Sequence, residues 1–231
     1  QRTLDATEKW QFQAYFNQTE LRDAVLDQRI DTPDVEWQHR FRLSPRQEIT
    51  WGLGYRQVTD ELQGGFTISF PRSKRSTQLY SAFVQDEIGL TEDLRLTLGS
   101  KFEHNDYTGF EVQPSARLLW RATATDSFWA ALSRAVQTPS RATHDSQLNY
   151  LVLPGPIVLP GPIVLPGPAV LGFRGSRNVD SEVLVSREIG YRRQFGPALN
   201  VDVTAFHNSY DQLLSLQSRP PVFFPYFLLA S

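Results

Sequence analysis

The chain has 231 residues, of which 40% are hydrophobic and 12% aromatic, and its formal net charge is -2. This balance excludes a disordered tail of low hydrophobicity and a basic nucleic-acid-binding domain, so we expect no nucleic-acid partner. The chain contains no Cys, which excludes disulfides, thiolate metal sites and cysteine nucleophiles.

Strict alternation of apolar and polar side chains is the main pattern in the sequence. Between positions 35 and 43, the odd positions carry large and mostly apolar side chains: Val35, Trp37, His39, Phe41 and Leu43. The even positions between them carry polar side chains: Glu36, Gln38, Arg40 and Arg42. A period of two predicts strands that have one apolar and one polar face.

This alternation, together with turn residues, predicts about nine strands. In chain order they are Trp10–Leu21, Val35–Ser44, Gln47–Thr59, Gln78–Leu90, Leu94–Asn105, Phe110–Ala122, Ser127–Val136, Glu182–Phe195 and Ala198–Leu216. No apolar run approaches the ~20 residues of a transmembrane helix. A strand of a membrane barrel, however, needs only ~9–11 residues of alternating character.

The predicted connections alternate between short and long. Tight turns are expected at 44–47, 91–93, 123–126 and 196–197, and long loops around Asp31, around Gly64-Gly65 and from Thr138 to Ser181. The hairpin at 106–109 is an exception, because it is short although it is expected on the same rim as the long loops. Short turns on one rim and long loops on the other are typical of a membrane barrel with periplasmic turns and extracellular loops.

The polar parity is expected to face a watery lumen. An Arg such as Arg40, Arg56 or Arg95 near the middle of the bilayer would cost ~2–4 kcal/mol if it faced lipid. A soluble sandwich or a lipocalin-like barrel also alternates, but the Trp and Tyr residues close to strand ends favour a membrane interface. An odd number of strands cannot close into a bacterial single-chain barrel. We therefore predict an all-β, antiparallel transmembrane barrel of which the chain is only a part.

A tandem repeat, VLPGPI-VLPGPI-VLPGPA-VLG, occupies positions 152–172 inside the long loop at 138–181. Pro-Gly suits a type II turn and Gly-Pro disfavours helix, so extended chain with turns is expected, and we expect no ladder strand here. Two interpretations stay open. The repeat is either an adhesive surface for a ligand or partner, or a duplication in a loop that tolerates insertion.

Catalytic chemistry is not expected. The four His residues are His39, His104, His144 and His207, and the consecutive His144-Asp145-Ser146 cannot aim at one another as a triad does. Gly52 and Gly54 alternate along a strand, so they are not a phosphate-binding loop and make room for a bulky neighbour instead. We expect neither an enzyme nor a bound cofactor or metal.

Four segments carry a family resemblance. They are LYSAFVQDEIGL from Leu79, LRLTLGSKFEHNDYTGFEVQPSARLLW from Leu94, FWAALSRAVQTPSR from Phe128 and SEVLVSREIGYRRQF from Ser181. In this order they resemble the TonB-dependent outer-membrane receptors, and the likeness runs from Glu36 to about Leu216. The resemblance implies part of a barrel of about 22 strands that holds a plug domain. The plug is expected to lie outside residues 1–231.

The implied function is uptake of a ferric siderophore or a similar scarce nutrient across the outer membrane of a Gram-negative bacterium. The implied partners are the TonB energy-coupling complex, the ferric chelate and outer-membrane lipid. A haem receptor is not supported, because Asn178-Val179-Asp180-Ser181-Glu182 lacks the Pro of the family's haem-receptor box. A passive porin-like or adhesin-like barrel and a soluble β-rich binding domain remain alternatives.

The resemblance also implies roles for particular residues. Arg134, Arg141, His144 and Asp145 lie where family members contact ligands, and the two guanidinium groups suit an anionic chelate. The alternative is that these groups are rim charges in water. Glu188 and Arg192 share the polar parity of one strand, which implies contact with the plug. Pairing with charges on neighbouring strands is the alternative for both.

Overall fold

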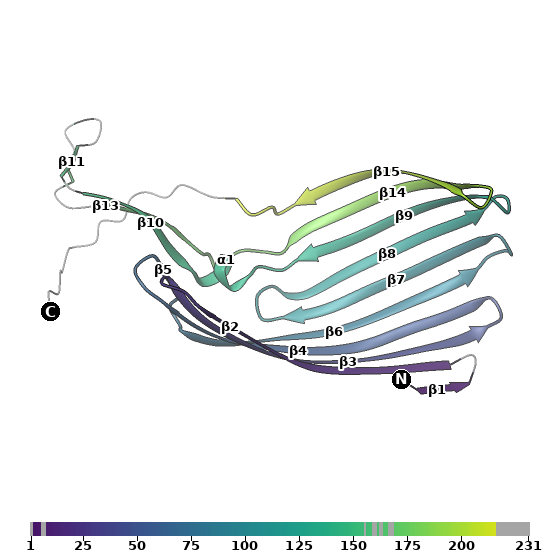
Figure 1. The fold of residues 1–231 in the computed structure, drawn as a ribbon, viewed down its shortest axis with the longest axis horizontal. Coiled ribbons are helices and arrows are strands. Elements are labelled where there is room, and N and C mark those ends of the chain that lie inside the picture. Colours follow the sequence, from purple (N-terminus) through teal and green to yellow (C-terminus); the bar gives the residue numbers. More distant parts are fainter. Residues whose placement is uncertain are drawn as a thin grey trace.

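The computed structural model describes residues 2–5, 8–154, 156–158, 161, 164–165 and 169–215. Ten antiparallel strands form the main sheet, in the order β1-β2-β3-β4-β6-β7-β8-β9-β14-β15 (Figure 1). Their bounds are β1 Arg2–Asp5, β2 Glu8–Arg22, β3 Leu26–Ser44, β4 Gln47–Gly64, β6 Lys74–Gly89, β7 Leu94–Asn105, β8 Gly109–Arg121, β9 Asp126–Gln137, β14 Glu182–Phe195 and β15 Leu199–Asp211. Within the described residues, β1 and β15 are unpaired edges, so the sheet is open.

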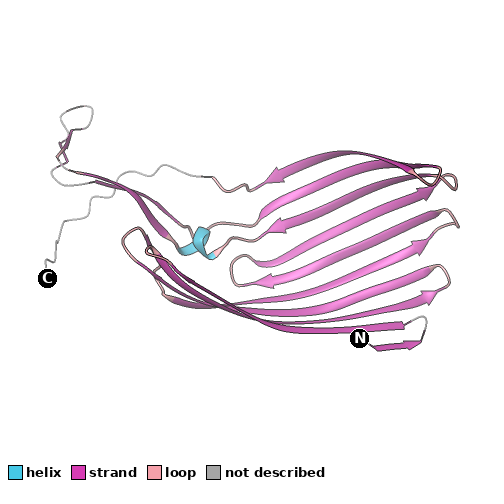
Figure 2. Ribbon diagram, in the orientation of Figure 1, coloured by secondary structure: helices cyan, strands magenta, loops and turns pink. Residues whose placement is uncertain are grey.

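Smaller elements lie at one end of the sheet (Figure 2). The helix α1 spans Arg141–Asp145, and β5 (Ile68–Ser69), β10 (Gln147–Leu153) and β13 (Ala169–Arg174) form a three-stranded sheet. A two-stranded ladder joins β11 (Ile157–Val158) to β12 (Val164–Leu165). We call this end of the main sheet the loop rim. The opposite end, with tight turns at 45–46, 90–93, 122–125 and 196–198, is the short-turn rim.

The two predicted faces of the sheet are confirmed by its register. On one face, rings from three strands meet: Trp10 and Trp37 lie 5.0 Å apart, and Trp37 and Trp51 lie 4.6 Å apart. On the other face, charges pair across strands, with Arg95 Nη1 2.8 Å from Glu87 Oε1. We call these the apolar face and the polar face. Cross-strand pairs of this kind are the units that fix the register of a sheet.

All nine predicted strands are present, but β3 and β4 extend further toward the loop rim than predicted. Asp31 lies inside β3 rather than in a loop, and β4 continues to Gly64, where a loop was expected. The added residues pair in register, for example Gln28 with Leu62 and Asp31 with Thr59. Most of their side chains are polar on both faces, and the exceptions include Ile30 and the buried Leu62. Hydrophobic alternation therefore gave no signal for them.

The structure corrects the expected strand count and the expected last strand. Within the described residues the main sheet has ten strands, because β1 adds one, so the argument from an odd number was wrong, although the sheet is open as expected. The last strand was expected to reach Leu216, but β15 ends at Asp211. Leu216 itself and everything after it lie outside the described residues.

The repeat region also differs from expectation, because it does form ladder strands. Ile157 pairs with Leu165 and Val158 with Val164, while Val152 and Leu153 of β10 pair with β13. Pro lacks an N–H group, but the residues between the prolines keep theirs and can pair. The β10 strand ends at Leu153, directly before Pro154. Positions 155, 159–160, 162–163 and 166–168 of the repeat lie outside the described residues.

Candidate functional site

The helix α1 brings three of the four predicted ligand-binding residues into one turn at the loop rim. Ser140 caps the helix, because its Oγ accepts a hydrogen bond of 3.1 Å from the backbone N–H of Thr143. Capping of this kind satisfies a donor that a short helix would otherwise leave free. Arg141, His144 and Asp145 therefore project from a fixed turn rather than from loose chain.

Asp145 joins α1 to two other segments. Its Oδ2 accepts a hydrogen bond of 2.6 Å from Arg75 Nη1 on β6, and its Oδ1 lies 3.3 Å from Arg177 Nε, between β13 and β14. His144 Nδ1 lies 3.0 Å from the same Oδ1. Burial acts to raise the pKa of Asp145, but the hydrogen bonds from His144 and Arg75 outweigh it, so this pKa is below its usual value. The negatively charged carboxylate thus links α1 to β6 and to the segment between β13 and β14.

Arg141 is held by the end of β4 and the loop after it. Its guanidinium pairs with Asp60 and donates to the backbone carbonyl of Arg72, and it lies 5.3 Å from the Phe70 ring centroid. The side chain is only 9% exposed. Arg141 therefore anchors α1 against the loop rim, and its charge is already balanced by Asp60.

The β7–β8 turn forms the opposite wall of the site. Asn105 Oδ1 accepts hydrogen bonds of 2.9 Å from the backbone N–H groups of both Tyr107 and Thr108, which fixes the turn. The Tyr107 ring lies 4.6 Å from the Arg75 guanidinium carbon and 5.1 Å from the His144 ring. Burial raises the pKa of the Tyr107 hydroxyl, because the side chain is covered by neighbours that include Arg75 and His144.

A polar hollow of about 210 Å³ lies between these segments. It is lined by Arg72, Arg75, Asp106, His144, Asp145 and Arg177. Three guanidinium groups against two carboxylates leave an excess of positive charge, which suits an anionic group. Sequence reasoning missed Arg72, Arg75, Asp106 and Arg177. The basic run Pro71-Arg72-Ser73-Lys74-Arg75 was a signal that could have drawn attention to two of them.

Arg134, the fourth predicted ligand-binding residue, does not line this hollow. It lies on β9, donates a hydrogen bond to the backbone carbonyl of Val112 and has its Nη2 3.9 Å from Glu111 Oε2. The structure thus uses Arg134 to join β9 to β8 where their backbone ladder ends at Ser133.

The predicted plug-facing pair lies on the polar face of β14. Arg192 Nε donates a hydrogen bond of 2.8 Å to Asp202 Oδ2 on β15, and Glu188 Oε1 accepts one of 3.1 Å from Ser186. Between them lies Gly190, where an added Cβ would come within 2.2 Å of Trp129 Nε1. The same arrangement recurs at Gly52, which lies under the ring of Phe83. This confirms that the strand glycine at Gly52 makes room for a bulky neighbour.

Neither a metal cluster nor a membrane-spanning helix is found in the part of the chain that the structure describes. No three His, Asp or Glu side chains there are grouped as metal ligands. No helix there has the length and apolar character to cross a membrane.

A family model for the TonB dependent receptor-like β-barrel matches residues 2–228. The chain belongs to this family. The family consists of receptors and is not a class of enzymes. Membership implies a location in the outer membrane of a Gram-negative bacterium. No protein of curated function matches the chain at a significant level.

Solved structures with the same fold include siderophore receptors. The siderophore receptor PirA from Pseudomonas aeruginosa is 19% identical with a TM-score of 0.67, and the match covers 89% of this chain and 37% of that one. PirA from Acinetobacter baumannii is 19% identical with a TM-score of 0.60, covering 83% of this chain and 28% of that one. A mutant of the ferric enterobactin receptor PfeA from Pseudomonas aeruginosa is 20% identical with a TM-score of 0.62, covering 80% and 27%. This chain therefore spans about a third of these receptors.

Proposed function

We propose that the chain forms part of an outer-membrane receptor that takes up a ferric siderophore or a similar scarce nutrient with energy from the TonB complex. The observation that carries the proposal is the family match over residues 2–228. The open antiparallel sheet agrees with it, because an unclosed sheet needs further strands before it can stand in a bilayer.

The loop rim is the proposed place of ligand capture. Arg72, Arg75 and Arg177 would attract the anionic part of a metal chelate, and His144 and Asp145 would complete the lining of the hollow. The hollow of about 210 Å³ is smaller than a usual ligand pocket of roughly 300–1,000 Å³. It would therefore hold one edge of the chelate, with other loops of the receptor covering the rest. Arg141 and Arg134 would support the site by fixing α1 and β9.

The polar face is the proposed contact surface for a plug domain. Arg192 and Asp202 form an ion pair that is partly exposed. Ser186 donates its hydrogen bond to only one of the two carboxylate oxygens of Glu188, namely Oε1. Such groups can exchange partners when a plug moves, because exposed ion pairs contribute only about 0–1 kcal/mol each.

Uptake by the full-length receptor tests the proposal. A strain that expresses the receptor should accumulate radioactive iron from siderophore complexes, and the same strain without functional TonB should not. Arg72→Gln and Arg177→Gln should weaken ligand binding by roughly 10- to 150-fold each, in line with about 1.5–3 kcal/mol for a hydrogen bond to a charged group. Arg22→Gln, at the end of β2 on the same rim, is the matched control. Uptake that persists without TonB would show a passive barrel instead.

A further inference from the structure

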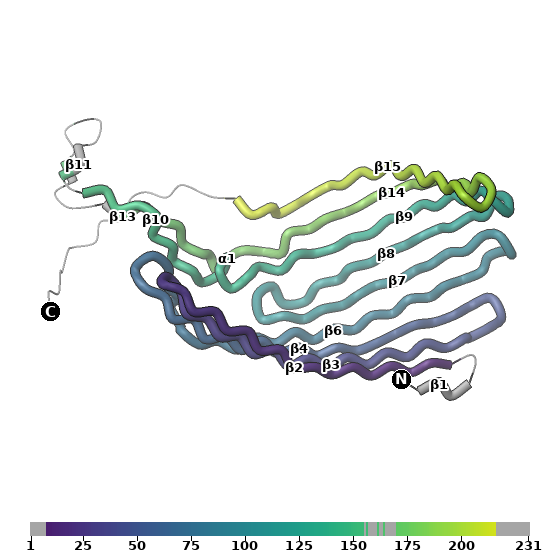
Figure 3. The backbone as a smooth tube through the Cα atoms, viewed as in Figure 1, coloured from purple at the N-terminus to yellow at the C-terminus, as the bar shows by residue number. Residues whose placement is uncertain are grey.

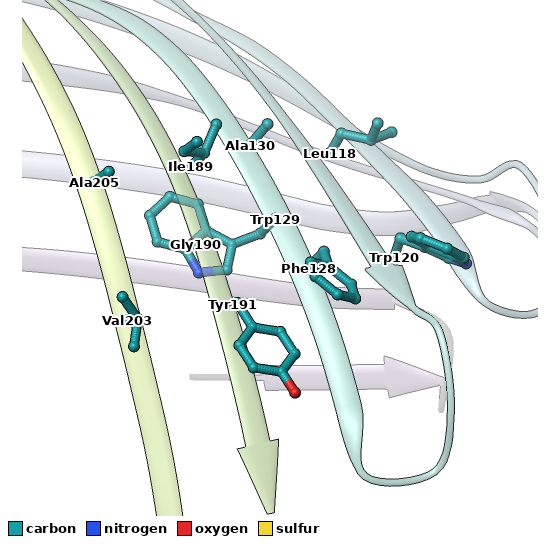
Figure 4. A pocket seen from close by; sticks show the side chains of 10 residues that line it. All are labelled: Leu118, Trp120, Phe128, Trp129, Ala130, Ile189, Gly190, Tyr191, Val203 and Ala205. Carbon is teal, nitrogen blue, oxygen red and sulfur yellow. The ribbon is translucent and has the colours of Figure 1, made fainter.

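A second hollow lies on the apolar face near the short-turn rim, across β8, β9, β14 and β15 (Figure 4). Its volume is about 450 Å³. Ala130 and Ala205 contribute small side chains to its lining, and Val203 lines it on β15. It is separate from the polar hollow at the loop rim and shares no residue with it.

A row of rings lines the hollow on the side nearer the turns. Trp120 and Phe128 are stacked with ring centroids 5.6 Å apart, and Phe128 and Tyr191 follow at 4.8 Å. The three side chains come from three adjacent strands and lie close together in Figure 4. Rings at this position are typical of the level where lipid headgroups meet acyl chains.

Opposite charges lie directly beyond the rings on the same face. Tyr191 donates a hydrogen bond of 2.6 Å from its hydroxyl to Asp126 Oδ1, and Arg193 Nε lies 3.6 Å from the same oxygen. Arg193 also lies over the ring of Phe195, and its side chain is 47% exposed. Asp126 Oδ2 accepts hydrogen bonds from the hydroxyl groups of Thr123 (2.6 Å) and Thr125 (2.9 Å), and its side chain is 15% exposed. The hollow therefore has an apolar body, a row of rings and a polar end, where Arg193 is the more exposed charge and the Asp126 carboxylate lies beside it.

We propose that this hollow is a binding site for one phospholipid with a phosphoethanolamine headgroup. One acyl chain would lie over Ala130 and Ala205, the phosphate would meet Arg193, and the ammonium group would meet Asp126. The charge pair carries the choice of headgroup, because Asp126 repels a headgroup with net negative charge while it attracts an ammonium group. This inference rests on the proposed function in one respect, namely that the chain stands in an outer membrane.

Native mass spectrometry of the full-length receptor tests the site. The receptor is reconstituted in nanodiscs of equal parts phosphatidylethanolamine and phosphatidylglycerol, then released into mild detergent. The wild type should retain one phosphatidylethanolamine in preference to phosphatidylglycerol. Ala130→Phe, which fills the hollow, should lower this retention at least tenfold. Asp126→Asn should remove the preference between the two lipids, whereas Arg193→Gln, which removes the contact to the phosphate that both lipids share, should lower the retention of both. Ala82→Phe, on the apolar face of β6 and outside the hollow, should retain the lipid as the wild type does.

Equal retention of both lipids by the wild type, or unchanged retention in Ala130→Phe, would overturn the site. Ala205→Phe on β15 serves as a second filling variant if Ala130→Phe does not fold, as judged by heat-modifiable mobility. Siderophore uptake, measured in parallel, separates this inference from the proposed function. Loss of lipid preference with normal TonB-dependent uptake contradicts the lipid site alone, whereas uptake that does not depend on TonB contradicts the proposed function.

Discussion

Asp145 ties the loop rim together, because one carboxylate contacts Arg75, His144 and Arg177. Its side chain is only 7% exposed, so the contacts are poorly replaced by water. We expect Asp145→Asn to cost about 1–3 kcal/mol of local stability. Hydrogen exchange of residues 141–146 in the full-length receptor should then speed up by roughly 5- to 150-fold. Asp180→Asn, at an exposed position of the same loop, should leave this exchange unchanged. Equal effects of the two variants would contradict the role given to Asp145.

The same carboxylate predicts how the rim responds to acid. Because the pKa of Asp145 is lowered in the folded protein, its stabilising effect is present above the usual pKa of about 3.9 and is lost as the pH falls through the lower folded value. Exchange of residues 141–146 should therefore be protected at neutral pH and should lose protection below about pH 4. The acid step should be absent from Asp145→Asn. A step of the same size in that variant would assign it to another group.

Gly190 offers a test of packing on the polar face. An added methyl group would meet the indole of Trp129 at 2.2 Å, so the ring must move. Gly190→Ala should lower the free energy of unfolding by about 1–3 kcal/mol, measured by denaturant titration of the full-length receptor. Gly65→Ala is the control, because an added Cβ there meets open space, and it should change stability by less than about 0.5 kcal/mol.

At the scale of elements, the structure separates what the sequence predicts from what it leaves open. The bounds of β7 and β14 agree with the prediction, because turn residues follow both strands, Asp106 to Gly109 after β7 and Gly196-Pro197 after β14. The outer parts of β3 and β4 were missed, because most residues there are polar and isolated apolar residues such as Ile30 and Leu62 make no alternating pattern. The helix α1 was missed as well, since five residues are too few for a helical period to show.

The sequence also predicted only part of the candidate site, namely the residues of α1 and not their partners. The stretch from Ser133 to Arg141 indicated the loop, and α1 gathers Arg141, His144 and Asp145 as a consequence of short-range capping. Their partners Arg75, Tyr107 and Arg177 come from distant segments. Only the pairing of strands brings those segments together, so no local pattern could show that they meet α1.

The cap of α1 provides a test at this scale. Ser140→Ala removes the hydrogen bond to the backbone N–H of Thr143, which should cost about 1 kcal/mol and loosen α1 against Arg75 and Asp60. Proteolysis of the loop in the full-length receptor should become several-fold faster. Ser140→Asp, which supplies another capping oxygen, should restore the original rate. Equally fast cleavage in both variants would show that the hydroxyl acts in some way other than capping.

At the scale of the whole molecule, the sheet is a wall with two unlike faces. Rings and aliphatic side chains gather on one face and charge pairs on the other, and the backbone trace in Figure 3 shows this wall slanting and curving without closing. A sheet with one apolar and one polar face can separate hydrocarbon from water only if the apolar face contacts lipid along the strands. The proposed capture of a ligand at the loop rim and the proposed lipid site near the short-turn rim both depend on this orientation.

The most direct measurement uses spin labels on single cysteines, which is free of background from this chain because it contains no Cys. Labels are placed at the neighbouring positions Thr97 and Leu98 on β7 and Arg117 and Leu118 on β8, in the full-length receptor reconstituted in bilayers. The account predicts that labels at Leu98 and Leu118 collide with oxygen dissolved in the lipid, and that those at Thr97 and Arg117 collide with a water-soluble nickel complex. Equal or reversed accessibility of neighbouring positions would contradict it.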